Sequence, residues 1–176
     1  MVIFVAGIYG VGKSTLCSFL SKELNIPNFS AGDLISEVNG EKYGSNKVVK
    51  DKNGNQDILV SAINEKYKTT NTFLLAGHFC IFNAENEVDM LPDFVFGNMN
   101  IGAILLLEAD VKTIIEHLSK RDGKHYSDLS IEKLQISERE QAEKISSQIG
   151  VPLLCHKMLF DGTDESIIKQ WIERYI

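Results

Sequence analysis

The chain has 176 residues, of which 44% are hydrophobic, 24% are charged and only three are proline. This composition is typical of a globular domain and excludes a disordered or low-complexity chain. The net charge of -6 argues against a surface that neutralises many phosphates of duplex nucleic acid. The three cysteines, Cys17, Cys80 and Cys155, lie far apart without metal-ligand spacing, so we expect small core residues in a reducing compartment.

The first predicted element is an apolar run, residues 2–6, whose β-branched members are typical of a strand buried on both faces. The run is too short for a signal peptide or a membrane span, and a glycine-rich loop follows it directly. We therefore expect a cytoplasmic protein that has no membrane partner.

Helical and strand patterns then alternate along the chain. Leu16, Leu20 and Leu24 recur at helical spacing and predict a helix over residues 13–24. We expect further strands within residues 27–31, 73–77, 101–109 and 151–160, and further helices from about residue 32 and over 111–120, 130–148 and 166–176. The alternation predicts an α/β fold of one domain, residues 1–176, in which helices cover both faces of a parallel sheet.

Three side chains outside the motifs have structural interpretations. Asp110 is expected to cap the helix over residues 111–120, and Glu108 to end the strand before it. Trp171 belongs to the apolar stripe of the last helix, and we expect it in the core rather than on a binding surface.

Residues 37–55 show no clear periodicity and predict a flexible insertion. Compact domains rarely contain unstructured loops longer than roughly 12–15 residues unless the loops bind something or move. The insertion carries Lys42, Lys47, Lys50 and Lys52, a positive bias within an acidic chain. A binding loop and an ordinary solvated loop both remain open.

The stretch after the first strand matches the phosphate-binding pattern G-x-x-x-x-G-K-S/T. Its glycines let the backbone curl so that successive amides point at phosphate oxygens, and the following helix directs its positive end toward the same anion. In this pattern the lysine can reach the β- and γ-phosphates and the serine hydroxyl can ligate Mg²⁺. We therefore predict that ATP with Mg²⁺ binds here, Ser14 being the metal ligand. The predicted nucleotide-binding residues are Gly7, Gly10, Val11, Gly12, Lys13, Ser14 and Thr15.

Beyond this loop the chain resembles P-loop nucleotide kinases of the adenylate-kinase type, most closely the archaeal-type members. The stretches FSAGDLISE (29–37) and FLLAGHFCI (73–81) resemble the segments that border the acceptor site in this family. The stretches AILLLEADVKTIIEHLSKRD (103–122) and SEREQAEKISSQIGVPL (137–153) resemble the elements before and after the lid, and FDGTDE (160–165) the turn near the adenine. The resemblance implies a three-layer P-loop NTP hydrolase fold, with the insertion on the acceptor side and a short lid at about residues 119–130.

The resemblance also implies an ATP-dependent kinase that transfers the γ-phosphoryl group to a nucleoside monophosphate or a nucleoside-like small acceptor. It assigns catalytic roles to Lys13, Arg121, Arg139 and Asp33, the two arginines supporting the transferring group. It assigns acceptor contacts to Asp33, Ser36 and His78. Asp33 could instead only cap a helix, His78 could be a structural histidine, and the basic loop before residue 130 could be a plain hydrophilic turn.

Three positions depart from the family pattern and keep other functions open. Ala76 stands where the family usually has an acid, and Ser36 and Cys80 stand where bacterial members grip the acceptor phosphate with arginines. Each lost charged contact costs roughly 1.5–3 kcal/mol of binding. One alternative is an ATP-binding sensor or slow ATPase that acts through a protein partner, and another is a kinase of a non-nucleotide hydroxyl. The acceptor's base, the choice of ATP or GTP, the acid that replaces Ala76 and the oligomeric state are left open.

Overall fold

The computed structural model describes residues 1–39 and 52–176 and contains a sheet of five parallel strands in the order β2-β3-β1-β6-β7. β1 (Val2–Ala6) is central, between β3 (Phe73–Ala76) and β6 (Ile101–Glu108). β2 (Asn28–Ser30) and β7 (Leu153–Lys157) form the edges. Every residue of β1 is buried, as a continuous apolar run requires when both faces of a parallel sheet are covered. The predicted parallel sheet is therefore confirmed.

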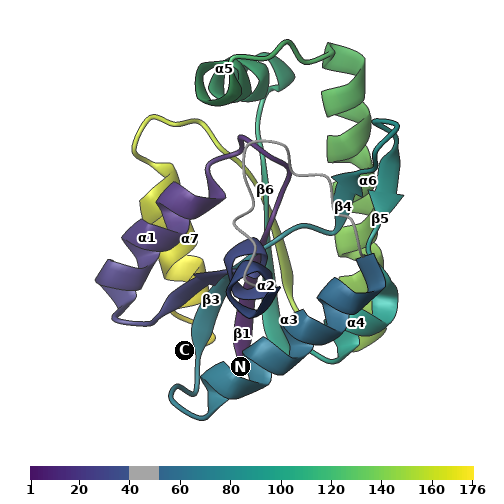
Figure 1. The fold of residues 1–176 in the computed structure, drawn as a ribbon. Helices are drawn as coiled ribbons and strands as arrows, with labels where there is room; N and C mark the ends of the chain where they lie inside the picture. The colour runs from purple at the N-terminus through teal and green to yellow at the C-terminus, as the bar shows by residue number, and fades with distance from the viewer. Residues whose placement is uncertain (40–51) are drawn as a thin grey trace.

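Helices cover both faces of this sheet (Figure 1). α1 (Lys13–Leu24) and α7 (Asp164–Ile172) pack together on one side. α4 (Asp93–Gly97) and α6 (Asp128–Ile149) lie on the other side. α2 (Ala31–Asn39) packs on α3 (Lys52–Tyr67), and α5 (Val111–Asp122) packs on α6. The three-layer α/β fold expected from the sequence is thus confirmed.

A two-stranded antiparallel hairpin, β4 (Cys80–Phe82) and β5 (Val88–Met90), lies against α6. Its turn is closed by the Asn83 side-chain oxygen, which accepts hydrogen bonds from the amides of Glu85 and Glu87 at 3.0 and 2.9 Å. Strands this short carry no usable alternation of apolar and polar residues, so the sequence pattern does not predict the hairpin.

The ends of two predicted loops are helical. α2 extends to Asn39 and α3 begins at Lys52, so the segment without regular structure does not span all of residues 37–55. Residues 40–51, with Lys42, Lys47 and Lys50, lie outside the described residues. α5 continues to Asp122 and α6 begins at Asp128, so only residues 123–127 lie between the helices of the predicted lid.

Three aromatic rings fill the core beneath the carboxyl ends of the strands. The ring centroids of Phe4 and Phe79 lie 5.1 Å apart, and Phe96 lies 5.8 Å from Phe4 and 4.6 Å from Phe79. All three side chains are almost fully buried. Within residues 1–39 and 52–176, no helix has both the length and the apolar character needed to cross a membrane.

Candidate active site

A cavity of about 640 Å³ opens at the carboxyl ends of the strands, where open parallel α/β sheets bind their ligands. Most of the predicted site residues are brought together here: its lining includes Gly10, Gly12, Lys13, Ser14, Thr15, Asp33, His78 and Arg121. Gly7, Val11, Ser36 and Arg139 are not part of the lining. The phosphate loop and two of the predicted acceptor residues, Asp33 and His78, therefore line one cavity.

Gly7 and Val11 support the phosphate loop on the side that faces the core. The backbone of Gly7 has a φ of 141°, and a Cβ atom there would lie 2.5 Å from the carbonyl oxygen of Leu107 and 2.9 Å from a methyl carbon of Val11. Only glycine fits this position, because a side chain would collide with the backbone of β6. Val11 is fully buried and packs the loop onto the core.

Lys13 bridges the two ends of the loop. Its ammonium group donates hydrogen bonds to the carbonyl oxygens of Gly7 and Ile8 at 2.6 and 3.0 Å. The charge is therefore held over the concave side of the loop, where a β- or γ-phosphate oxygen can take the place of a carbonyl.

The Ser14 hydroxyl and the Asp33 carboxylate are the oxygen groups near which a magnesium ion would be bound. Both line the main cavity and an adjoining cavity of about 330 Å³. No group of three or more potential metal-ligating His, Cys, Asp or Glu side chains occurs in the described part of the chain. Mg²⁺ is usually bound by one or two protein oxygens together with substrate phosphates and water, so one hydroxyl and one carboxylate suffice.

Glu138 is a site residue that sequence reasoning missed. It is buried on α6, and its carboxylate accepts hydrogen bonds from the amides of Gly7 at 3.0 Å, Phe79 at 2.9 Å and Cys80 at 2.6 Å. Burial raises the pKa of this carboxyl to about 7, although the three amides and the charge of Lys13 favour the ionised form. The carboxylate thus joins the phosphate loop to the segment that carries His78.

The sequence contains a signal for Glu138. The buried face of α6 includes Ile131, Leu134, Ala142 and Ile145, and Glu138 falls on the same face. A lone acid within an apolar helical stripe must find buried partners, because an unpaired buried charge is costly. Such a position is therefore a candidate for a carboxylate with a defined task.

Arg121 reaches the cavity from the end of α5. Its guanidinium donates to the two carboxylate oxygens of Asp122 at 2.5 and 2.6 Å, and the Tyr126 hydroxyl donates to Asp122 at 2.6 Å. The hydrogen bond from Arg121 lowers the pKa of Asp122 to about 2. Asp122 and Tyr126 therefore hold Arg121 in place at the mouth of the phosphate loop.

Arg139 is placed differently from the prediction. Its guanidinium forms a double hydrogen bond with the Glu108 carboxylate, with the Nε to Oε1 distance at 2.8 Å, and lies 3.8 Å from Glu143. Glu108 is indeed a strand-end residue, at the end of β6. The arginine lies outside the cavity lining in this arrangement, so its catalytic role stays a prediction.

The side chains of two other residues with predicted roles, Ser36 and Asp110, have partners within the chain. The Ser36 hydroxyl donates to the carbonyl oxygen of Gly32 at 2.8 Å, along its own helix. Asp110 is the N-cap residue of α5, as predicted, but its side chain forms no capping hydrogen bond and is paired with Lys157 at 2.7 Å instead.

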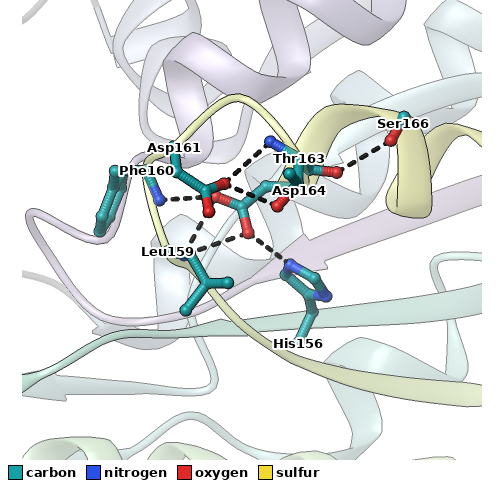
Figure 2. A network of polar contacts seen from close by, with 7 residues as sticks. All are labelled: His156, Leu159, Phe160, Asp161, Thr163, Asp164 and Ser166. Atoms are coloured by element: carbon teal, nitrogen blue, oxygen red, sulfur yellow. Dashed lines mark hydrogen bonds and ion pairs between the residues drawn. The ribbon is translucent and has the colours of Figure 1, made fainter.

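A hydrogen-bonded turn connects β7 to α7 (Figure 2), and its residue Phe160 lines the cavity. The Asp164 carboxylate accepts hydrogen bonds from His156 Nε2 at 2.8 Å, from the Leu159 amide at 3.0 Å and from the Phe160 amide at 2.8 Å. Although burial opposes ionisation, these donors keep the pKa of Asp164 below its usual value. Asp161 accepts hydrogen bonds from the amide and hydroxyl of Thr163 at 2.9 and 2.6 Å.

This turn presents Phe160 beside the phosphate loop. The ring of Phe160 lies 5.0 Å from the ring of His117, whose Nδ1 donates to the Gly10 carbonyl oxygen at 2.9 Å. A Cβ atom at Gly12 would lie 3.3 Å from Phe160. Two rings next to the polyphosphate cradle are a suitable place for a nucleoside base to pack.

The glycine-rich phosphate loop, with its lysine and serine, lies between β1 and α1 of a parallel α/β fold. This arrangement defines a P-loop α/β protein. The chain belongs to the AAA domain family, whose model matches residues 6–135. No curated protein matches it.

Among solved structures, the chain is similar to shikimate kinase from Bacteroides thetaiotaomicron, with 18% identity, a TM-score of 0.65, and coverage of 99% of this chain and 96% of that one. It is also similar to shikimate kinase from Aquifex aeolicus, with 17% identity, a TM-score of 0.56, and coverage of 99% and 95%. A gluconokinase from Sinorhizobium meliloti has 13% identity, a TM-score of 0.54, and coverage of 98% and 94%. These similarities show the fold. None of them is specific to adenylate kinases, so the resemblance to the adenylate-kinase type stays a prediction.

Proposed function

We propose that this protein is an ATP-dependent kinase that transfers the γ-phosphoryl group to a small acceptor, either a nucleoside monophosphate or a nucleoside-like molecule. The observation that carries the proposal is that one cavity is lined both by Lys13 and Ser14 of the phosphate loop and by Asp33 and His78. Donor and acceptor can therefore meet in one enclosure. Kinases of small molecules among the structures with this fold support the same class of reaction.

The residues suggest a mechanism of positioning and electrostatics. The loop amides and Lys13 hold the β- and γ-phosphates, and the Ser14 hydroxyl would ligate Mg²⁺, whose charge would offset that of the phosphate oxygens. Arg121 stabilises the negative charge of the transferring group. Where the acceptor is a hydroxyl, Asp33 takes its proton as the new bond to phosphorus forms.

A second candidate is an ATP-dependent sensor or slow ATPase that acts through a protein partner. It is supported by Ala76, which ends β3 without an acid, and by the pairing of Arg139 with Glu108 away from the cavity lining. Both features leave the nucleotide cradle intact while reducing the groups available for transfer.

One assay separates the two candidates. The protein is incubated with Mg²⁺ and ATP labelled on the γ-phosphate, together with nucleosides, nucleoside monophosphates or small alcohols. A labelled acceptor supports the kinase, and release of inorganic phosphate that no acceptor changes supports the sensor. The same reactions without acceptor give the background hydrolysis.

A further inference from the structure

Tyr9 is an aromatic residue within the phosphate loop, between Ile8 and Gly10. It is half-buried and lines the cavity, and its ring packs on the ring of His78 with the two centroids 4.3 Å apart. His78 follows β3 and is predicted to contact the acceptor. The Tyr9 ring therefore connects the loop that would bind ATP with a residue that is expected beside the acceptor.

The backbone on both sides of Tyr9 is held in place. The carbonyl oxygen of Ile8 accepts a hydrogen bond from Lys13 Nζ at 3.0 Å, and that of Gly10 accepts one from His117 Nδ1 at 2.9 Å. A Cβ atom at Gly10 would lie 2.9 Å from a side-chain carbon of α5, so the loop packs closely on that helix. The position of the phenol is thus defined before a ligand binds, which is what a group that stabilises a transition state requires.

Two cations lie close to this phenol. Lys13 binds the carbonyl oxygen of the residue before Tyr9, and in phosphate loops this lysine reaches the β- and γ-phosphates. Arg121 follows His117 by four residues, so both lie on the face of α5 that meets the loop. Because Lys13 and Arg121 would both hold the γ-phosphate, that group is expected beside the Tyr9 phenol.

The phenol is a hydrogen-bond donor at neutral pH. Burial raises the pKa of Tyr9 to about 12, with a contribution from the charge of Glu138, whereas the charge of Arg121 acts in the lowering direction. The proton therefore stays on the phenol oxygen, and the group can donate it to an anionic oxygen. Such a charge-assisted hydrogen bond is stronger than one between neutral groups, and it strengthens further where negative charge develops during a reaction.

We propose that Tyr9 is a catalytic residue of the phosphoryl transfer, whose hydroxyl donates a hydrogen bond to an oxygen of the γ-phosphoryl group as that group passes to the acceptor. This role rests on the proposed function, because ATP supplies the phosphoryl group. An oxygen of the acceptor forms a bond to the γ-phosphorus, and the bond from that phosphorus to the bridging oxygen of ADP breaks. Where the acceptor is a hydroxyl, its proton passes to Asp33. Tyr9 keeps its own proton and forms no covalent bond, so it acts only on the charge of the phosphoryl oxygens.

Tyr9→Phe tests this role, because it removes the hydroxyl and keeps the ring that packs on His78. The probe is ATP: formation of ADP is measured at saturating Mg²⁺ and ATP, without acceptor and with each nucleoside, nucleoside monophosphate and alcohol of the labelling assay. Calorimetry with a non-hydrolysable ATP analogue measures nucleotide affinity separately. We expect the fastest of the rates to fall by about 10- to 100-fold, the effect of one lost hydrogen bond to a charged group. The affinity should change by less than about 3-fold, because the donor acts mainly on the transition state.

The matched control is Tyr175→Phe. It removes the same atom from a half-buried tyrosine beyond the end of α7 that does not line the cavity. Both the rate and the affinity should equal those of the wild type. Urea unfolding of the two variants shows whether the loss of either hydroxyl affects the fold.

An unchanged rate in Tyr9→Phe overturns the role given to the phenol. A loss of rate that is matched by an equal loss of ATP affinity overturns it as well, because Tyr9 would then only support the structure of the loop. Either result leaves the proposed kinase intact when the wild type transfers label to an acceptor. A wild-type protein that forms no ADP under any of these conditions contradicts the proposed kinase itself.

Discussion

Glu138 on α6 accepts a hydrogen bond from the backbone amide of Gly7, 131 positions earlier in the chain, at 3.0 Å. The same carboxylate accepts hydrogen bonds from the amides of Phe79 and Cys80. One buried side chain thereby fixes the position of the phosphate loop relative to the segment that carries His78. The helix that follows the lid is thus connected to both segments.

We predict that Glu138→Gln lowers the free energy of unfolding by about 1–3 kcal/mol. A glutamine side chain places an N–H group against at least one of the three backbone donors, which then loses its acceptor. Urea unfolding measures the change. Glu140→Gln, an exposed glutamate of the same helix, is the control and should change stability by less than about 0.5 kcal/mol. Equal effects of the two substitutions would contradict the role given to Glu138.

Glu138 should also affect how stability depends on pH. Burial places its pKa at about 7, above the ordinary value of 4.5, so between these values the folded protein binds a proton that the unfolded chain does not. The contribution of this group to stability is therefore full below about pH 4.5 and decreases as the pH rises toward 7. Urea unfolding of the wild type and of Glu138→Gln, measured from about pH 5 to 8, should give a difference that follows this direction. A difference that is constant over this range would show that the pKa is not raised.

The phosphate loop and the central strand were predictable because their signals are local. A five-residue apolar run followed by a glycine pattern specifies strand, cradle and helix within residues 2–24. The same holds for the buried strands β3 and β6, whose apolar runs do not depend on neighbours in space. The hairpin strands β4 and β5 are three residues each and have no comparable signal.

The side-chain partners in the site were less predictable, because they depend on contacts between distant parts of the chain. Arg139 is 31 positions from its partner Glu108, and no local signal favours that pair over a contact with phosphate. The resemblance identified Arg121 as a lid residue, but not that Asp122 and Tyr126 would hold it in place. Motifs thus locate functional groups along the chain, whereas the fold determines which of them reach the cavity.

Lys13→Ala should weaken binding of the ATP–magnesium complex by roughly 10- to 100-fold, since one ammonium contact to phosphate contributes about 1.5–3 kcal/mol. Isothermal titration calorimetry with ATP and Mg²⁺ measures the affinity. The control is Lys22→Ala, an exposed lysine in the last turn of the same helix, which should bind ATP as the wild type does. Unchanged affinity in Lys13→Ala would remove the loop lysine from nucleotide binding.

Arg121→Ala should lower kcat by about 100-fold with a smaller effect on KM, because its guanidinium is proposed to act mainly on charge that develops in the transition state. Release of ADP in the presence of a productive acceptor measures both constants. Lys120→Ala changes an adjacent exposed cation that does not line the cavity and serves as the control. A rise in KM alone for Arg121→Ala would instead assign the residue to ground-state binding.

Asp164→Asn should loosen the turn that carries Phe160 and weaken ATP binding as well as folding. The carboxylate accepts hydrogen bonds from His156 and from the amides of Leu159 and Phe160, and its replacement should cost about 1–3 kcal/mol of stability.

Because the pKa of Asp164 is lowered in the folded protein, this contribution is present above the unfolded pKa and is lost as the pH falls through the folded value. The loss in the variant should therefore be largest near neutral pH and shrink under acidic conditions. Asp161→Asn, which affects only the exposed contacts to Thr163, is the graded control with an expected cost below about 1 kcal/mol. Thermal or urea unfolding and calorimetry with ATP provide the two measurements; a stability loss with unchanged ATP affinity would show that the turn does not contribute to ATP binding.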